Sequence, residues 1–253
     1  MTQIYLLSFL TGLCFGSFAS VVIYRLHSGQ KGLFWGRSNC PKCKHALAPT
    51  DLVPVFSFLA NKFKCHYCRK PISLTYPLLE LTMGLCFLMT TYWAGIESLW
   101  KLPYYLFLTF IFVAISFYDI LYQEIPDQLS LPTIVLAGLA DVFGHLIAPS
   151  SLIIGFAIPV VFFGAMFFGS RGRWIGGGDI RIGAIMGLVL GYPKVLVALF
   201  LAYCIGSLFS VVGLITKRIR LKSAIPFGPF LFLGTYIAMI WGDKILNWYL
   251  KFI

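Results

Sequence analysis

The chain has 253 residues, of which 59% are hydrophobic and only 11% are charged. Soluble globular domains carry about 25% charged residues, so this composition excludes that class and indicates a membrane protein. The formal net charge of +11 would suit a nucleic-acid partner, but the chain has no soluble domain of the usual kind to bind one, and we expect none.

Eight apolar stretches are candidates for membrane-spanning helices, which need about 20 apolar residues each. In chain order they are residues 4–24, 77–96, 102–118, 131–148, 151–169, 180–191, 195–215 and 227–241. The first lacks the basic start and the small-residue cleavage site of a signal peptide, so we expect it to be retained as a helix. The predicted fold is an all-α polytopic membrane protein with about eight transmembrane helices.

The basic residues predict the orientation in the membrane. Sixteen of the 20 lysines and arginines fall in three segments, nine in 25–70, three in 171–181 and four in 217–222. With eight helices, all three segments lie on one side, which the positive-inside rule makes cytoplasmic. Both termini then face outward.

One polar segment, residues 27–75, is long enough to fold by itself. It carries two CxxC pairs with 21 residues between them, formed by Cys40, Cys43, Cys65 and Cys68. Four thiolates in this pattern predict a tetrahedral zinc site that stabilises a segment too small for its own core. Two unrelated redox or incidental pairs are the alternative, whereas disulfides do not suit a cytoplasmic loop. His45 and His66 adjoin the pairs and could substitute as ligands.

Two aspartates at the ends of apolar stretches are the candidate catalytic residues. Asp119 ends the third stretch and Asp179 follows the glycine run 176–178, and the predicted topology places both on the same face. Ionisable groups at bilayer depth are read as functional by default. A close pair of carboxylates can share one proton, so that one activates water while the other polarises a carbonyl. A proton or cation relay in a transporter and a structural pairing with Arg173 or Arg181 remain alternatives.

The sixth stretch is unusually short. Its 12 residues, 180–191, make a helix of about 18 Å, which does not cross a hydrocarbon core of about 30 Å. We expect neighbouring helices to shield it and water to enter part of the way. The glycines at 176–178 would allow backbone angles closed to other residues and a close approach by substrate.

Three further features have structural interpretations. We expect Glu80 to compensate the dipole of the second helix, with a direct function as the alternative, and Asp127 to cap the fourth helix. Small residues in the first stretch favour close helix packing: Gly12, Gly16, Ser17 and Ser20.

Several segments together resemble the type IV prepilin peptidases, membrane aspartyl proteases of the GxGD class. The resemblance runs in family order through residues 16–25, both CxxC pairs, 76–80, Asp119 with 125–127, 176–184 and 225–234. Arg181 stands where lysine is commoner in that family. The two CxxC pairs are similar to those of its longer, bifunctional members.

The resemblance implies a function. It implies that Asp119 and Asp179 cleave the short basic leader of prepilins or pseudopilins at the cytoplasmic face of a bacterial inner membrane. Many members also methylate the new N-terminus with S-adenosylmethionine, and here that activity rests on the resemblance alone, with unknown cofactor-binding residues. The implied organisation is a first transmembrane helix (1–26), a zinc loop (27–75) and a membrane-embedded peptidase core (76–253).

Overall fold

A computed structural model describes residues 2–30, 36–95, 100–144, 146–220 and 223–251. Lys31 and Lys222 of the basic segments and Ile96 at the end of the second predicted stretch lie outside these residues. The described chain is helical apart from irregular connections and two isolated β-bridges, which confirms the all-α class. It divides into two compact units, Met1–Ala114 and Ile115–Ile253.

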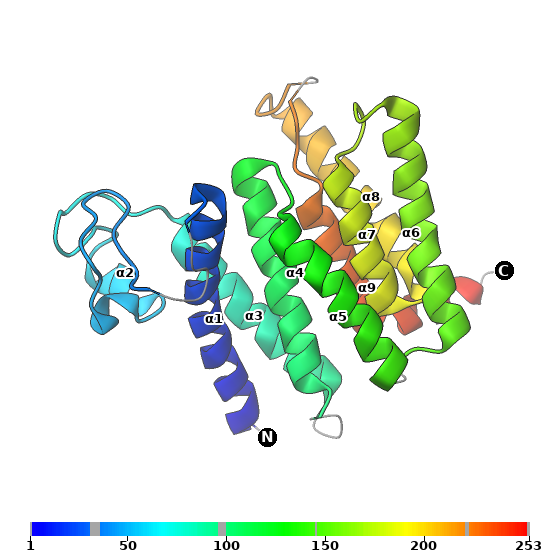
Figure 1. Ribbon diagram of the computed structural model, residues 1–253, viewed down its shortest axis with the longest axis horizontal. Helices are drawn as coiled ribbons and strands as arrows, with labels where there is room; N and C mark the ends of the chain where they lie inside the picture. The colour runs from blue at the N-terminus through cyan, green and yellow to red at the C-terminus, as the bar shows by residue number, and fades with distance from the viewer. Residues whose placement is uncertain (1, 31–35, 96–99, 145, 221–222, 252–253) are drawn as a thin grey trace. The chain divides into compact units, whose positions relative to one another are not determined.

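The first unit is built on two long helices joined by the cysteine-bearing loop (Figure 1). Its elements are α1 (Thr2–Ser28), η1 (Pro49–Leu52), α2 (Phe56–Ala60), α3 (Thr75–Ala94) and the first half of α4 (Leu102–Tyr122).

Small residues bring α1 and α3 together, as the sequence predicts. A Cβ on Gly12 would lie 2.8 Å from the Cα of Gly84 on α3, so the backbones approach too closely for a side chain. One turn earlier on α1, the Ser8 hydroxyl donates a hydrogen bond to the Phe87 carbonyl (3.0 Å) and lies 2.6 Å from the Thr91 hydroxyl. Close packing and hydrogen bonds thus hold the pair in one register.

The second unit surrounds a short central helix. Its elements are the last turns of α4, α5 (Asp127–Gly144), α6 (Pro149–Ser170), α7 (Gly177–Leu190), α8 (Lys194–Ile215) and α9 (Gly228–Leu250). Helix α7 packs against α5, α6, α8 and α9, and Figure 1 shows it among them. Most of its residues are buried, which confirms the prediction of a short helix shielded by its neighbours.

Glycines set the contact between α6 and α7. A Cβ on Gly155 would lie 2.6 Å from the Cα of Gly191, at the end of α7. A Cβ on Gly183 would lie 2.7 Å from the ring of Phe163, which is itself fully buried. Because the backbones meet directly, α7 is enclosed by helices although it has only 14 residues.

Each of the eight predicted apolar stretches corresponds to a helix. Four of these helices, α1, α4, α6 and α8, are long and apolar enough to cross a membrane. The largest shift in a helix start is in α5, which begins at Asp127 rather than at residue 131. A hydropathy pattern does not detect this first turn, because its residues are polar. The helix starts there because the Pro126 carbonyl accepts hydrogen bonds from the amides of Leu129 and Ser130.

The packing of α1 on α3 predicts a strong effect of one added methyl group. Gly12→Ala should force the helices apart and lower the free energy of unfolding by about 1–3 kcal/mol. Gly138→Ala is a matched control, because a Cβ at Gly138 meets nothing within 4 Å and should stabilise α5 by about 0.5–1 kcal/mol. Thermal unfolding in detergent would measure both, and equal effects would contradict the close contact.

Candidate active site

Asp119 lies in the last turn of α4 and is 5% exposed. Its Oδ2 accepts a hydrogen bond of 2.9 Å from the backbone N–H of Gly228, the first residue of α9. The first N–H groups of a helix have no partner within the helix, so they are available to a carboxylate. The start of α9 therefore positions the first candidate acid.

Asp179 is the third residue of α7 and is 7% exposed. Its Oδ2 accepts a hydrogen bond of 3.2 Å from the backbone N–H of Gly176, the residue that caps the helix. This is the return half of a capping box, in which an acid in the first turn reaches back to the capping residue. Both acids are thus held by backbone donors at the start of a helix.

One cavity of about 740 Å³ in the second unit brings the two acids together. Both carboxylates line it, and they interact electrostatically with each other. Tyr203 of α8 lines the same cavity and interacts electrostatically with Asp179; nothing in the sequence pattern singles it out. The predicted pair of aspartates is therefore a pair in space.

The glycines of this site are needed for space rather than for unusual backbone angles. Gly176 has an ordinary φ of −78°, and none of residues 176–178 is among those with positive φ, so that part of the prediction is wrong. A Cβ on Gly178 would lie 2.6 Å from the Cβ of Ile125, and one on Gly228 would lie 2.7 Å from the Oδ2 of Asp119. Both positions allow a segment distant in sequence to approach the acids.

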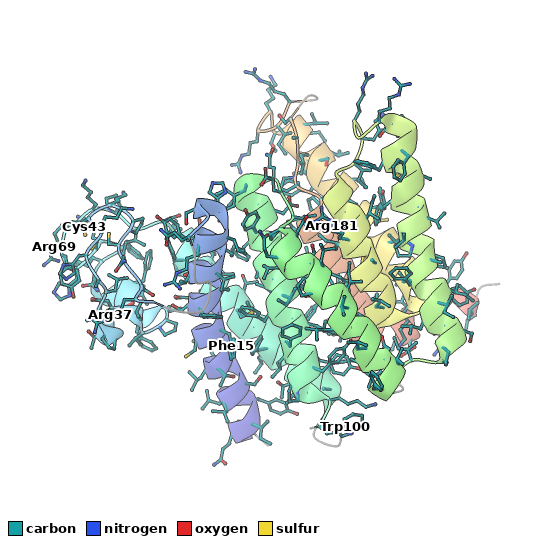
Figure 2. The ribbon with its side chains drawn as sticks, viewed as in Figure 1. Phe15, Arg37, Cys43, Arg69, Trp100 and Arg181 are labelled. Atoms are coloured by element: carbon teal, nitrogen blue, oxygen red, sulfur yellow. The ribbon has the colours of Figure 1, made fainter. Side chains whose placement is uncertain are left out.

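Arg181 pairs with a different acid from the two in the cavity. Its guanidinium forms an ion pair with Asp127 at the start of α5 and lies 3.5 Å from the hydroxyl of Ser130; Figure 2 labels it near the start of α7. In the described part of the chain, no basic side chain pairs with Asp119 or Asp179, so the structural-pairing alternative is wrong there. The Asp127 side chain is 61% exposed, so this pair adds little stability.

Glu80 has a different environment from the one predicted. It lies beyond the first turn of α3 and is 7% exposed, whereas the dipole effect is confined to the first turn. Its Oε2 accepts a hydrogen bond of 2.8 Å from the Val55 amide. Compensation of the helix dipole is therefore not its role.

The two CxxC pairs form two loops of the same shape. In the first, the Lys44 amide donates to the Cys40 carbonyl (2.8 Å), and in the second the Arg69 amide donates to the Cys65 carbonyl (3.0 Å). Lys44 and Arg69 both take the left-handed conformation, with φ of 61° and 57°. Figure 2 labels Cys43 and Arg69 on the segment between α1 and α3. Two such knuckles are what a metal held by two CxxC pairs requires.

Hydrogen bonds already favour thiolate at one of these cysteines. Burial raises the pKa of the Cys40 thiol, but N–H donors from Cys43 and Lys42 outweigh it and the pKa falls to about 7. The His45 amide lowers the pKa of the Cys43 thiol, but burial and the neighbouring cysteines outweigh that donor and raise it to about 11. The thiols thus do not ionise together by themselves, whereas Zn²⁺ binds them all as thiolates.

The cysteine geometry fits a zinc ion. Their sulfur atoms all lie within 4.8 Å of one another, and Zn–S bonds of about 2.3 Å in a tetrahedron place sulfurs about 3.8 Å apart. The adjacent histidines have other contacts: His66 lies 3.4 Å from Asp51, and the His45 ring lies 3.7 Å from that of Tyr67. The four cysteines are therefore the group that could hold a zinc ion.

Comparison with known proteins identifies the family. Residues 10–94 match the bacterial peptidase A24 N-terminal domain, and residues 106–211 match the type IV leader peptidase family. Curated relatives named prepilin leader peptidase/N-methyltransferase include that of Bacillus subtilis (strain 168), 30% identical over 96% of this chain and 96% of its own. Those of Aeromonas hydrophila (31%, over 96% and 93%) and Legionella pneumophila (30%, over 98% and 95%) are similar. The chain belongs to the type IV leader peptidase family.

This membership confirms the resemblance seen in the sequence, and it does not favour a transporter. No solved structure matches the chain. Each matched segment contains one of the two candidate sites, the aspartate pair or the cysteine cluster. The leader peptidase match (106–211) contains Asp119 and Asp179, and the N-terminal match (10–94) contains the four cysteines.

The tetracysteine geometry predicts about one zinc ion per chain. Cys40→Ser and Cys65→Ser should each lower bound zinc and the amount of folded protein together, because the loop has no core to replace the metal. Cys204→Ser is the control, since this cysteine is exposed on α8. Metal analysis of the purified protein would measure the content, and a folded, active protein without zinc would refute the site.

Proposed function

We propose that this protein is an aspartic endopeptidase that removes the leader of prepilins or pseudopilins, with Asp119 and Asp179 as its catalytic pair. One observation carries the assignment: two buried carboxylates face a common cavity, interact with each other and have no basic partner among the described residues. The family and the names of the relatives supply the substrate class.

The pair can catalyse hydrolysis by sharing one proton. The ionised carboxylate takes a proton from water, whose oxygen attacks the scissile carbonyl carbon, while the protonated carboxylate donates a hydrogen bond to the carbonyl oxygen. The C–N bond then breaks as the leaving amine takes a proton from the pair. The acids titrate as one unit, so the two roles are assigned to the pair rather than to single residues.

The reaction takes place, in this proposal, at the cytoplasmic face of a bacterial inner membrane. Eight helices, α1 and α3 to α9, would cross or enter the bilayer, which supports the placement because the three basic segments then share one side. The four long apolar helices are consistent with a multi-pass protein. Anionic lipid would contact the basic residues of that face.

The functional organisation that we propose has three parts. Residues 1–26 form the first transmembrane helix, 27–75 the zinc loop and 76–253 the peptidase core. The zinc ion would be structural, because four thiolates leave no open coordination position for a reaction. The second activity in the relatives' names supports N-methylation of the new N-terminus by S-adenosylmethionine.

The acid pair predicts the strongest effects of substitution. Asp119→Asn and Asp179→Asn should each abolish cleavage of a prepilin-like peptide by the purified protein in detergent, with zinc content near normal. The losses should be non-additive, because either change removes the shared proton and the double variant has little left to lose.

Asp127→Asn is the matched control for these variants. It makes the same chemical change at an exposed carboxylate and should reduce cleavage only slightly, because the exposed pair with Arg181 contributes little. Substantial cleavage by either single variant at the catalytic pair would rule out the aspartyl mechanism.

Labelling of single cysteines would test the orientation. In a background without other reactive thiols, a cysteine at position 220 should react with a membrane-impermeant reagent only after the membrane is opened. A cysteine at position 101 should react in cells that lack an outer barrier. The reverse pattern would place the catalytic pair on the outer face and contradict the proposed site of cleavage.

A further inference from the structure

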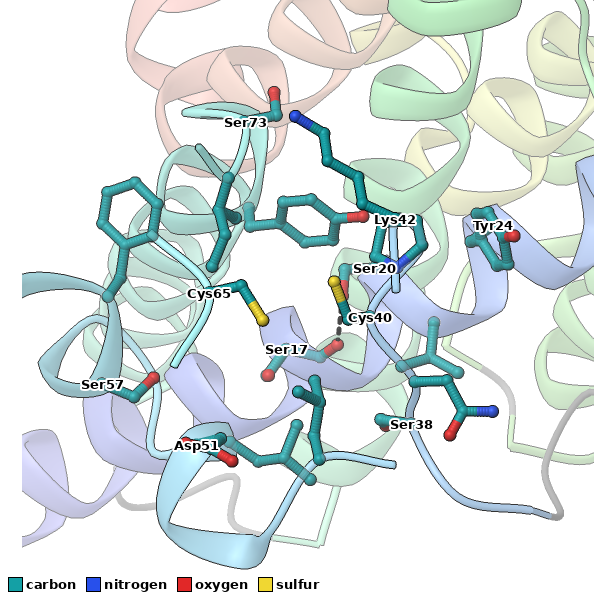
Figure 3. A pocket seen from close by; sticks show the side chains of 18 of the residues that line it. Ser17, Ser20, Tyr24, Ser38, Cys40, Lys42, Asp51, Ser57, Cys65 and Ser73 are labelled. Atoms are coloured by element: carbon teal, nitrogen blue, oxygen red, sulfur yellow. Dashed lines mark hydrogen bonds between the residues drawn. The ribbon is translucent and has the colours of Figure 1, made fainter. Parts of the chain in front are cut away.

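Part of the loop between α1 and α3 lies beside α1 rather than beyond its end. Two serines of α1, Ser17 and Ser20, line a cavity of about 560 Å³ together with Ser57 of α2. Figure 3 shows these three side chains around it. Ser17 lies 11 residues before α1 ends at Ser28, which is about 16 Å at 1.5 Å per residue. Helix α2 is therefore alongside α1.

A hydrogen bond fixes the level of α2 along the two long helices. Val55, which precedes α2, donates its amide to the Oε2 of Glu80, and a Cβ on Gly16 would lie 2.5 Å from the Glu80 Cα. The apolar stretch of α3 starts at Pro77, so Glu80 lies about 5 Å inside it. The apolar stretch of α1 ends at Tyr24, so Gly16 lies about 12 Å inside it. Helix α2 thus starts at a level within the apolar span of both helices.

The exposed face of this segment is apolar. Phe56 is 70% exposed and Leu59 is 55% exposed, whereas Phe58, between them in the sequence, is only 7% exposed. Large exposed apolar side chains recur here at steps of three or four residues, which places them on one side of a helix. They are Leu52, Val53, Phe56, Leu59 and Phe63. An exposed apolar patch of this kind marks a surface that contacts a partner or a membrane.

The charges beside this face are positive. Lys62 and Lys64 follow α2 and are exposed, and neither forms an ion pair in the described part of the chain. Residues 36–74 contain seven lysines and arginines and a single acid, Asp51, which already contacts His66 and Tyr67. An apolar face with lysines at its edge is complementary to a membrane surface that carries anionic lipid.

We propose that residues 52–63 insert their apolar side chains into the cytoplasmic leaflet of the membrane, with Lys62 and Lys64 at its anionic headgroups. The inference rests on the proposed placement of α1 and α3 across the bilayer. An interfacial helix buries its apolar face about 5–10 Å into the boundary between headgroups and acyl chains, and Glu80 lies at that depth. The lipid around α1 and α3 is continuous with this face and would cover it.

Insertion would also stabilise a strained backbone. Val55 before α2 and Phe63 after it have φ of 63° and 65°, in the left-handed region that bulky and β-branched residues disfavour. In water this conformation leaves Phe56 and Leu59 exposed. In lipid the same side chains would be removed from water, which favours the conformation that presents them. The segment around α2 is thus a membrane anchor of the cysteine-bearing loop.

Photo-crosslinking of the full chain in vesicles of phosphatidylcholine and phosphatidylglycerol would test the insertion. Phe56→p-benzoylphenylalanine should form adducts with lipid acyl chains, detected by mass spectrometry of the labelled peptide. Tyr67→p-benzoylphenylalanine is the matched control, because Tyr67 is an exposed aromatic residue of the same loop that lies against His45 and His66, and it should form few or none. Leu10→p-benzoylphenylalanine reports on the placement of α1, where Leu10 is exposed.

The outcomes separate the anchor from the topology. Lipid adducts at position 10 but not at 56, or equal adducts at 56 and 67, would overturn the anchor while leaving α1 in the bilayer. Adducts of position 56 with a second protein chain would overturn it as well and make this face a protein interface. No lipid adduct at 10 or 56 would contradict the proposed topology, and the anchor with it.

Amide hydrogen exchange would test the lysine contacts. Exchange of residues 52–63 should be slower by about fivefold or more in these vesicles than in phosphatidylcholine alone, the effect expected for one lysine near an anionic surface. Lys62→Gln with Lys64→Gln should remove most of this difference. Arg218→Gln with Arg220→Gln is the matched control, since it removes two exposed charges from another basic segment, and should preserve the difference. Equal exchange of the wild-type segment in both lipids would overturn the lysine contacts.

Discussion

The burial of carboxylates among apolar helices is the constraint on which the rest of this structure depends. An isolated charge in such surroundings is costly, so each acid needs hydrogen-bond donors that come from the protein itself. The start of a helix offers N–H groups without partners. Asp119 uses the start of α9 and Asp179 the start of α7. The two candidate catalytic acids therefore lie beside helix starts, because the free N–H groups there supply the hydrogen bonds that the buried carboxylates need.

Glycine packing makes this arrangement possible. Helix α7 is too short to span a bilayer by itself. It is enclosed because Gly155 of α6 and Gly183 of α7 leave room for the two helices to pack closely. At the acids themselves, Gly178 and Gly228 leave room for Ile125 and for the Asp119 carboxylate. A larger residue at either position would move a helix start away from the acid that it supports.

The first unit also contains a buried carboxylate, and its hydrogen-bond donor comes from a loop rather than from the start of a helix. Glu80 is buried between α1 and α3 and accepts a hydrogen bond from the amide of Val55, a residue with a φ of 63°. The loop that supplies Val55 is too small for a hydrophobic core, and its two matching knuckles bring four sulfurs together instead. The loop that supplies Val55 to Glu80 is thus also the loop that brings the four cysteines together.

The sequence by itself determined the features that depend on local pattern. Apolar runs predicted the eight helices, and the CxxC spacing predicted the cysteine cluster. The membrane face that the basic residues predict for Asp119 and Asp179 stays a prediction. Helices and cysteine clusters can be predicted in this way because hydrophobic burial and metal ligation both require certain residue types at regular spacing along the chain.

Only the tertiary structure decided which groups meet. Residue spacing did not predict the Gly228 amide beside Asp119, the pairing of Arg181 with Asp127 or the burial of Glu80 under Val55. Glu80 and Val55 are 25 residues apart in the chain, and Asp119 and Gly228 are 109 apart. Such contacts are set by how closely helices pack, and that depends on the shapes of both surfaces rather than on the pattern of either one.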